Sequence, residues 1–281
     1  MASLPLPTSS YAEESSISVE PLLRRQLSRL LVETASWKAP FQEIIDVFRK
    51  KEWKAVFFGG VPRDLVLYGP SKRPRDVDIV VDCSPQELDS VVASYPFRRT
   101  RFGGFRIAFG KWSFDIWSLR NTWAFASGYM DPTFDNLPKT TFFNVEAIAA
   151  QFNTRPRKRR ALYSFGFSEA ISSRVLDINF EPNPFPQLCV IRGLVTAARH
   201  RFLLSSRLAT YILERATRTD IAEIMHAQFA HYGVVHLRAE DIMSFMSRIE
   251  FRLKQSPSSP VSLPQMDAQQ LMLPSFDHVD V

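Results

Sequence analysis

Apolar residues recur at steps of three and four near the beginning of the chain. Between residues 20 and 50 these positions are Leu22, Leu23, Leu27, Leu30, Leu31, Phe41, Ile44, Ile45 and Phe48. Such spacing is typical of amphipathic helices, because it places the apolar side chains on one face. The run Trp37-Lys38-Ala39-Pro40 interrupts the pattern with a proline. We therefore expect two helices with a break at that run.

A different pattern follows, in which a short apolar run ends at two glycines. Ala55-Val56-Phe57-Phe58 precedes Gly59-Gly60, which predicts a buried strand followed by a tight turn. Pro62 is suited to the first turn of a helix that would continue to Tyr68. We expect a second strand at residues 77–81 and another helix from Pro85 to about Ala93.

The middle of the chain predicts further strands, and the last third predicts helices. Residues 105–109 and 112–117 flank Gly110-Lys111, so we expect a β-hairpin there. Another strand is expected near Thr140–Val145. From about Pro186 the apolar positions return to helical spacing, and similar patterns cover residues 205–218, 219–231 and 238–253.

These patterns predict an α+β chain in which a mixed part precedes an all-helical part. Both ends of the chain are rich in serine, and the second is also rich in proline, which is typical of flexible tails. The expected divisions are a tail over residues 1–18, a mixed head over 19–150, a connecting segment over 151–184, a helical part over 185–254 and a tail over 255–281.

Composition narrows the class of protein. The 281 residues are 45% hydrophobic, which is enough apolar material for a substantial core. Two cysteines, Cys83 and Cys189, make no disulfide framework, so we expect a reducing, cytoplasmic setting. The first residues lack the basic and apolar regions of a secretory signal, and no apolar run approaches membrane-spanning length. We therefore expect neither a membrane protein nor a secreted one.

Charge is unevenly distributed along the chain. The two tails hold five of the 29 acidic residues and none of the 35 basic ones, so residues 19–254 carry 35 basic against 24 acidic side chains. This excess favours a polyanionic partner, or it only keeps the surface well solvated. The densest basic run contains Arg155, Arg157, Lys158, Arg159 and Arg160. The run could follow the phosphates of an RNA or serve as a solvated linker, and the basic body favours RNA.

Three carboxylates carry the strongest chemical signal. Asp76 and Asp78 are two residues apart on a predicted strand, so their side chains point to the same face. Asp115 lies on a later strand that can bring it beside them. Clustered carboxylates repel one another unless a cation neutralises them, and Mg²⁺ prefers such oxygen ligands. These residues therefore predict a catalytic site that binds Mg²⁺, with Mn²⁺ as an alternative ion.

Gly59, Gly60 and Arg63 fit the other half of such a site. Glycines let backbone N–H groups approach a phosphate closely, and the following helix directs its N-terminus at the anion. The guanidinium of Arg63 would add a fork of donors. Each feature is common by itself. Their order of strand, two glycines, helix and strand favours metal-dependent transfer of a nucleotide from a nucleoside triphosphate.

Residues 57–67 read Phe-Phe-Gly-Gly-Val-Pro-Arg-Asp-Leu-Val-Leu, and residues 75–80 read Arg-Asp-Val-Asp-Ile-Val. Both stretches resemble the head motif of the class II nucleotidyltransferases, which are the CCA-adding tRNA enzymes and bacterial poly(A) polymerases of the DNA-polymerase-β-like superfamily. The similarity continues at residues 102–107, 114–120, 145–149 and 191–202. It implies a polymerase-β-like nucleotidyltransferase head, a mixed sheet with flanking helices, followed by an all-helical neck.

The resemblance also implies a role for each candidate residue. Asp76 and Asp78 would bind the catalytic metal ions, and Asp115 would help to deprotonate the attacking hydroxyl. The residues that would hold the nucleotide are Gly59, Gly60, Arg63, Asp64 and, one turn into the neck, Arg192.

Two departures from the family fall where it recognises the base. The family's Arg-Arg-Asp-Phe stretch is matched here by Thr140-Thr141-Phe142-Phe143, and its following asparagine position is Glu146. The family's Glu-Asp-x-x-Arg motif, which reads ATP and CTP, is matched by Phe185-Pro186-Gln187-Leu188-Cys189. We therefore expect an intact phosphate and metal half and an altered base-reading half. The chain also ends soon after the neck, so ordinary CCA maturation is not expected.

The sequence thus predicts a nucleotidyltransferase that moves a nucleoside monophosphate from a nucleoside triphosphate onto an RNA 3′ end, with tRNA as the favoured acceptor. One alternative is transfer to a protein or a small molecule, as a toxin or a regulator would do. Another is a non-catalytic RNA-binding relative that keeps the fold. The expected partners are the nucleoside triphosphate and RNA, a protein partner is compatible with the sequence, and a membrane is not expected.

Overall fold

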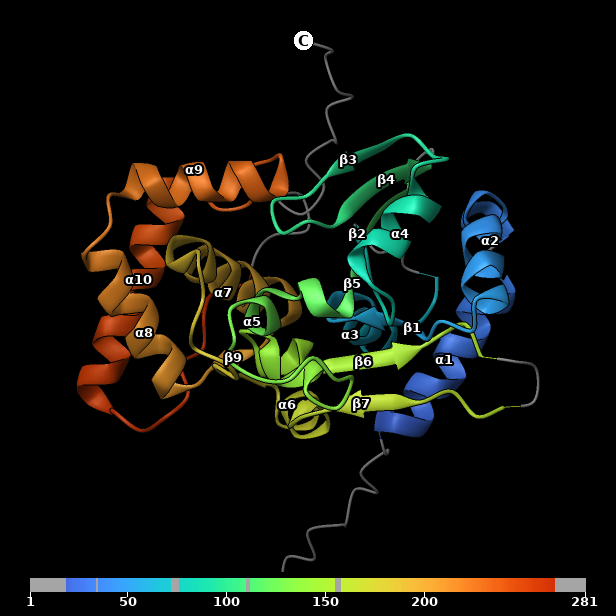
Figure 1. Ribbon diagram of the computed structural model, residues 1–281. Coiled ribbons are helices and arrows are strands. Elements are labelled where there is room, and N and C mark those ends of the chain that lie inside the picture. The colour runs from blue at the N-terminus through green and yellow to red at the C-terminus, as the bar shows by residue number, and fades with distance from the viewer. Residues whose placement is uncertain (1–18, 34, 72–75, 110–111, 155–157, 266–281) are drawn as a thin grey trace, which may run out of the picture.

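A mixed sheet of seven strands forms the centre of the head (Figure 1). The computed structural model describes residues 19–33, 35–71, 76–109, 112–154 and 158–265. The strand order is β3-β4-β5-β2-β1-β6-β7, with β2 and β5 parallel and the other described neighbours antiparallel. The strands are β1 Ala55–Phe58, β2 Asp76–Val81, β3 Phe97–Arg99, β4 Phe105–Phe109, β5 Trp112–Ser118, β6 Ile148–Gln151 and β7 Leu162–Ser164.

Helices cover one face of this sheet. Alternate strand residues such as Phe57, Ile79 and Phe114 point to this face and are fully buried. Leu23 and Ile44 from the first two helices belong to the same core, in which the apolar stripes predicted from the sequence are buried. The covering helices are α1 Val19–Glu33, α2 Ala35–Lys50, α3 Gly60–Tyr68 and α4 Pro85–Val92.

The opposite face of the sheet is covered by shorter segments. Val56, Val80 and Ala149 point to it and form a small core with Phe125 and Leu137. The segments above them are η1 Leu119–Asn121, α5 Trp123–Ala126 and η2 Leu137–Thr140. Because side chains alternate along β2, two of its earlier residues share this face with Val80, and both are aspartates.

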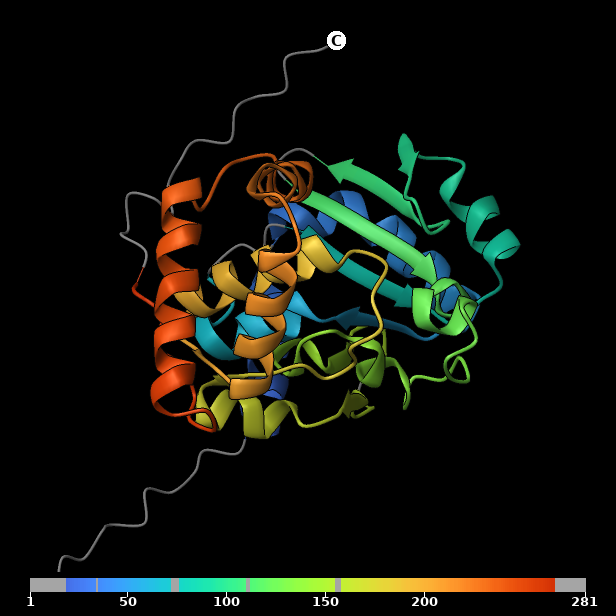
Figure 2. The same ribbon diagram turned by 90° about the vertical axis from the view of Figure 1, so that its left-hand side faces the viewer.

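A second core lies in the helical part, beside the sheet and away from α1 and α2 (Figures 1 and 2). Helix α7 packs against both α8 and α9, and α10 packs on α8. Phe143 and Val145 also enter this core and so connect it to the head. No helix in the described ranges is both long and apolar enough to cross a membrane. The remaining elements are η3 Asn144–Glu146, α6 Phe167–Ser173, β8 Val175–Leu176, α7 Pro186–His200, β9 Leu203–Leu204, α8 Ser206–Thr217, α9 Ile221–Tyr232 and α10 Ala239–Gln255.

The α+β class predicted from the sequence is confirmed, as are the strand, glycine turn and helix at residues 55–68. Strands β4 and β5 pair as the predicted hairpin requires, while Gly110-Lys111 lies outside the described residues. The sheet also continues past residue 150, because β7 pairs with β6 from within the segment expected to be a connection.

Two local predictions are wrong. Helix α1 ends at Glu33 and α2 already begins at Ala35, so Trp37–Pro40 lies within α2, where Pro40, the sixth residue, costs the helix one backbone hydrogen bond. The strand expected at Thr140–Val145 is replaced by the 3-10 turns η2 and η3. Here the side chain of Asn144 accepts hydrogen bonds from the N–H groups of Val145 and Asp177, both at 2.9 Å. These contacts fix a turn in place of an extended strand.

Candidate active site

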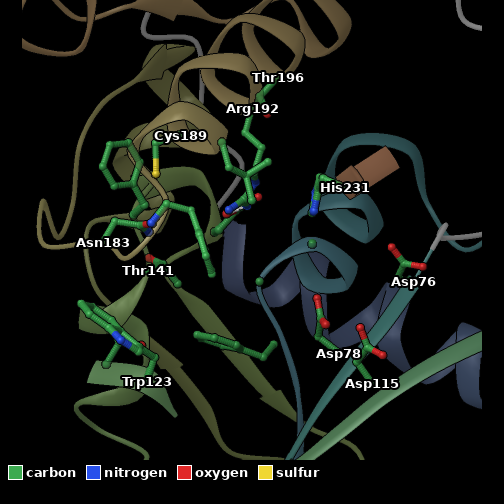
Figure 3. Close-up of a pocket in the computed structure, with 18 of the residues that line it drawn as sticks. Asp76, Asp78, Asp115, Trp123, Thr141, Asn183, Cys189, Arg192, Thr196 and His231 are labelled. Carbon is green, nitrogen blue, oxygen red and sulfur yellow. Dashed lines mark hydrogen bonds and ion pairs between the residues drawn. The ribbon is translucent and has the colours of Figure 1, made fainter. Parts of the chain in front are cut away.

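The three candidate carboxylates meet on two neighbouring strands. Asp78 of β2 lies directly opposite Asp115 of β5 in the parallel register, and Asp76 lies one side-chain repeat earlier on β2. All three line a cavity of about 760 Å³ between the sheet and the helical part (Figure 3). The sequence therefore places the predicted cluster correctly, because i and i+2 positions on a strand share a face.

Negative charge is concentrated at Asp78. Burial, together with the nearby charges of Asp115, Asp76 and Glu146, raises the pKa of this carboxyl to about 7. Since burial and like charges both disfavour the ionised form, near neutral pH this carboxyl either takes up a proton or keeps its charge beside a cation. This cluster can thus attract a positively charged ligand.

Asp115 already has a cationic partner. The guanidinium of Arg106, from the neighbouring strand β4, donates from Nε at 2.7 Å and from Nη2 at 2.5 Å to the two carboxylate oxygens. This hydrogen bonding raises the pKa of Arg106 above its usual range. Across the part of the chain that the structure describes, no three Asp, Glu, His or Cys side chains converge closely enough to hold a metal ion. A cation bound by Asp115 would have to compete with Arg106 for its carboxylate oxygens.

The glycine turn forms another wall of the cavity. Gly59 ends β1 with a φ of +61°, a left-handed conformation that favours glycine, and Gly60 begins α3. A Cβ on Gly60 would lie no closer than 3.7 Å to the Arg63 guanidinium, and a Cβ on Gly59 would contact Glu146. The first turn of a helix leaves N–H groups without partners inside the helix. The N-terminal end of α3 therefore faces the cavity.

Arg63 and Arg192 share one carboxylate at this wall. Arg63 donates to Glu146 Oε1 at 3.0 Å and to Asp64 at 2.8 Å, and Arg192 donates to Glu146 Oε2 at 2.6 Å. Burial by itself would raise the pKa of Glu146, but the two guanidinium groups outweigh it and hold the pKa below its usual value. Because Arg63 belongs to α3 and Arg192 to α7, Glu146 links the head to the helical part. Both arginines lie where they could reach an anion in the cavity.

One part of the wall supplied by the helical part, near the start of α7, is apolar. Phe185, Leu188 and Cys189 line it near the start of α7, opposite Trp123 and Phe142 of the head. Asn183, Thr141 and Thr196 also line this part of the cavity, and Arg192 lies one turn further along α7 from Cys189 (Figure 3). A planar, partly apolar group could therefore lie here with few hydrogen-bonding partners.

Sequence reasoning missed one group in this cavity. His231, near the end of α9, lies between Arg192 and the three aspartates in Figure 3. Its positive charge contributes to lowering the pKa of Glu146, which shows that the two groups are close. No local pattern marks His231, because it reaches the cavity through the packing of α9 on α7.

The basic run does not line the cavity. Gln151, which precedes it, pairs with Val56 at the start of β1, whereas Gly59 follows the other end of that strand. Lys158, Arg159 and Arg160 therefore lie beyond the opposite end of β1 from the glycine turn. Arg155 and Arg157 lie outside the described residues. The predicted RNA contact thus concerns a surface separate from the carboxylates.

Comparison with known proteins identifies the fold. No family model matches the chain, and no curated protein sequence matches it. Solved structures do match. A CCA-adding enzyme in complex with ATP aligns with a TM-score of 0.57 and 16% identity over 82% of this chain and 55% of its own. A tRNA nucleotidyltransferase complexed with a primer tRNA and an incoming ATP analog aligns with a TM-score of 0.53 and 18% identity over 75% and 61%.

These likenesses confirm the resemblance seen in the sequence at the level of the fold. The apo form of a CCA-adding enzyme aligns equally well, with a TM-score of 0.57 and 18% identity over 81% of this chain and 54% of its own. The chain therefore has the fold of CCA-adding enzymes and tRNA nucleotidyltransferases, and it spans 54% to 61% of the length of these three.

Proposed function

We propose that this chain, which has the fold of tRNA nucleotidyltransferases, transfers a nucleoside monophosphate from a nucleoside triphosphate onto the 3′ end of an RNA. The 3′ oxygen would form a bond to the α-phosphorus while the bond to the β-phosphate breaks, and pyrophosphate would leave. One observation carries the proposal. A single cavity joins the paired carboxylates Asp78 and Asp115 to the glycine turn and to Arg63. Solved structures of the same fold contain ATP, CTP or tRNA, which supports a triphosphate donor and tRNA as the favoured acceptor.

The carboxylates suit Mg²⁺, with Mn²⁺ as the alternative. Their oxygens are the ligands that both ions accept, and the raised pKa of Asp78 reflects negative charge that a cation would offset. Asp76 and Asp78 would hold the ion, and Asp115 would join them on leaving Arg106. When bound, Mg²⁺ would stabilise negative charge on the phosphates and lower the pKa of a coordinated hydroxyl.

Residues of the chain itself would accept the proton and bind the phosphates and the base. Asp115 would accept the proton of the 3′ hydroxyl, and Arg106 would release it to do so. Arg63 and Arg192 would donate to the phosphates from N–H groups that Glu146 does not use. The base would lie against Phe185 and the apolar side chains next to it. With water displaced, these contacts would hold the α-phosphorus in line with the hydroxyl.

The same wall argues against ordinary CCA maturation. Thr141, Phe142 and Glu146 stand at the positions of the family's Arg-Arg-Asp-Phe stretch and its asparagine, and all three line the cavity. Phe185 and Cys189 stand at two positions of the family's base-reading motif. An apolar wall with few donors and acceptors discriminates weakly between bases. We therefore propose a nucleotide choice different from the sequential use of CTP and ATP.

A label-transfer experiment tests this proposal. Purified protein is incubated with each α-³²P-labelled nucleoside triphosphate, Mg²⁺ and total cellular RNA, and RNA is then separated from protein. Label at RNA 3′ ends supports the proposal and identifies both nucleotide and acceptor. Label in protein or in a small molecule would show that this molecule, and not RNA, is the acceptor. Absence of label with retained RNA binding would favour the non-catalytic alternative.

A further inference from the structure

A cluster of basic side chains lies where α1, the end of α2 and the connection between β6 and β7 meet (Figure 1). The guanidinium of Arg24 on α1 donates to the backbone carbonyl of Arg160. Arg160 in turn donates from Nη1 to the hydroxyl of Ser28 on α1 at 3.1 Å. These reciprocal contacts fasten the described end of the basic run to α1. The basic cluster consists of Arg24, Arg49, Lys158, Arg159 and Arg160.

The basic cluster is electrostatically crowded. Burial lowers the pKa of Arg24, and the charge of Arg159 lowers it further. Burial also lowers the pKa of Arg160, and there the charge of Arg49 adds to the effect. Within the described ranges, the buried Nε atoms of Arg24 and Arg160 have no hydrogen-bond partner. Like charges held this close repel one another, so a ligand of high negative charge density would be stabilised here.

Few acidic side chains offset this charge. Glu20 lies 3.8 Å from Arg24, and Asp46 lies 3.1 Å from Arg49. Among the residues that the structure describes, the five positive charges of the basic cluster therefore have two acidic partners, which lie on α1 and α2. Lys158 and Arg159 are exposed, so their charged ends can be reached from solvent.

The location of the basic cluster separates it from the cavity. It lies beyond the start of β1, while the glycine turn lies beyond the end of that strand. Helices α1 and α2 also cover the sheet face opposite to the one that carries Asp76 and Asp78. Strand β1 alone is about 13 Å long. A ligand that occupies both places must therefore extend over several nucleotides around the β7 edge of the sheet.

We propose that the basic cluster binds the phosphodiester backbone of the acceptor RNA at a distance from its 3′ end. This inference rests on the proposed function for the identity of the RNA. Guanidinium forks match phosphate oxygens in pairs, and a nucleic acid supplies closely spaced phosphates at a density that suits crowded arginines. Phosphate contacts carry no sequence information but fix register and orientation. The enzyme would therefore select RNAs whose body reaches the basic cluster, and a short oligonucleotide would occupy only the cavity.

Binding measurements with two RNAs test this inference independently of catalysis. The variant Lys158→Ser/Arg159→Ser removes two exposed charges, and the control Arg252→Ser/Lys254→Ser removes two from the exposed surface of α10. The affinities of a full-length tRNA transcript and of its 3′-terminal oligonucleotide are measured by fluorescence anisotropy over a series of salt concentrations. Thermal unfolding confirms that both variants are folded.

The variant Lys158→Ser/Arg159→Ser is expected to bind the transcript about tenfold more weakly and to bind the oligonucleotide normally. For the transcript, the slope of log affinity against log salt concentration should be smaller in magnitude by about two. The control should leave both affinities within about twofold. Unchanged transcript binding by the variant would overturn the inference. So would an equal loss for both RNAs, or an equal loss in the control. If wild-type protein binds RNA in this way but transfers no nucleotide, the proposed function fails and the binding surface stands.

Discussion

Arg192 of α7 donates a hydrogen bond to Glu146 of the head at 2.6 Å, across 46 residues of sequence. The Glu146 side chain is only 13% exposed, and the second arginine on the same carboxylate, Arg63, comes from α3. This ion-pair network connects head and helical part at the wall of the cavity.

Glu146→Gln should therefore destabilise the protein. The substitution leaves the charge of Arg192 without its carboxylate, while Arg63 keeps Asp64 at 2.8 Å, and breaking a buried pair typically costs about 3 kcal/mol. Because the native pKa of Glu146 is lowered, its contribution is present above the unfolded pKa and is lost as pH falls through the native pKa. The difference in unfolding free energy between wild type and variant should have its maximum value at pH 7 and should decrease below about pH 4.

Chemical denaturation at several pH values measures this difference. Glu181→Gln is the matched control, because Glu181 forms an exposed ion pair with Arg207 at 3.0 Å. Its effect should stay below about 1 kcal/mol at all pH values. An Glu146→Gln variant as stable as wild type at pH 7 would show that the network contributes no stability.

Gly60→Ala should weaken binding of the nucleoside triphosphate without unfolding the protein. A Cβ at Gly60 meets its nearest atom at 3.7 Å, which is ordinary contact, and alanine is favourable in a helix. It would nevertheless keep phosphate away from the backbone, and losing one charge-assisted hydrogen bond weakens affinity about tenfold. Equilibrium dialysis with a labelled triphosphate and a thermal melt provide the two readouts.

Gly59→Ala supplies the contrast for this prediction. Its φ of +61° is unfavourable for alanine, so stability should fall by about 1–2 kcal/mol. Normal triphosphate affinity in a folded Gly60→Ala protein would rule out a phosphate contact at the turn.

Arg106→Gln should tighten the binding of Mn²⁺ by about 30-fold. The substitution frees both oxygens of Asp115 and removes a positive charge, whose repulsion of a divalent ion is worth about 2 kcal/mol at roughly 4 Å in water. Isothermal titration with Mn²⁺ measures the affinity directly. Arg99→Gln removes a comparable exposed partner, of Asp89, outside the cavity and should have no effect. Unchanged affinity in Arg106→Gln would mean that Asp115 takes no part in holding the ion.

Bound triphosphate should protect His231 from chemical modification. This side chain lines the cavity between Arg192 and the aspartates, whereas His226 on the same helix is exposed and lies outside the cavity lining. Diethylpyrocarbonate modification followed by peptide mass spectrometry compares the two residues with and without the triphosphate. We expect bound triphosphate to slow the modification of His231 by at least about fivefold and to leave that of His226 unchanged. For scale, a tenfold change corresponds to about 1.4 kcal/mol of binding free energy. Equal modification of His231 in both states would place the triphosphate elsewhere.

The parts of this structure that the sequence predicts are those that short-range patterns determine. The alternation at Asp76 and Asp78 fixes a shared face, and the glycines at 59–60 fix a turn at the end of a buried strand. Long-range contacts determine the rest. Asn144 forms a turn because it bonds to the backbone of Val175 and Asp177, more than 30 residues away.

The same limit applies to the candidate site. The resemblance to nucleotidyltransferases leads to Arg192. The ion pair of Arg192 with Glu146 and the position of His231 in the cavity, however, depend on how α7 and α9 pack. The Arg106–Asp115 ion pair follows from the register of β4 on β5, in which Phe109 pairs with Trp112. A two-residue hairpin loop at Gly110-Lys111 implies this register, but it does not show that the two side chains form an ion pair.

Single-turnover extension of a defined tRNA transcript by wild type and by Asp78→Asn tests the central claim most directly. The substitution keeps the shape of the side chain and removes its charge. The account predicts that wild type adds a nucleotide and that extension by Asp78→Asn is slower by at least about 100-fold. Loss of a residue that only supports a metal ligand already costs up to about 100-fold in activity. Affinity for the transcript should stay within about twofold. Extension by Asp78→Asn at the wild-type rate, or no extension by wild type with any nucleoside triphosphate, would contradict the claim.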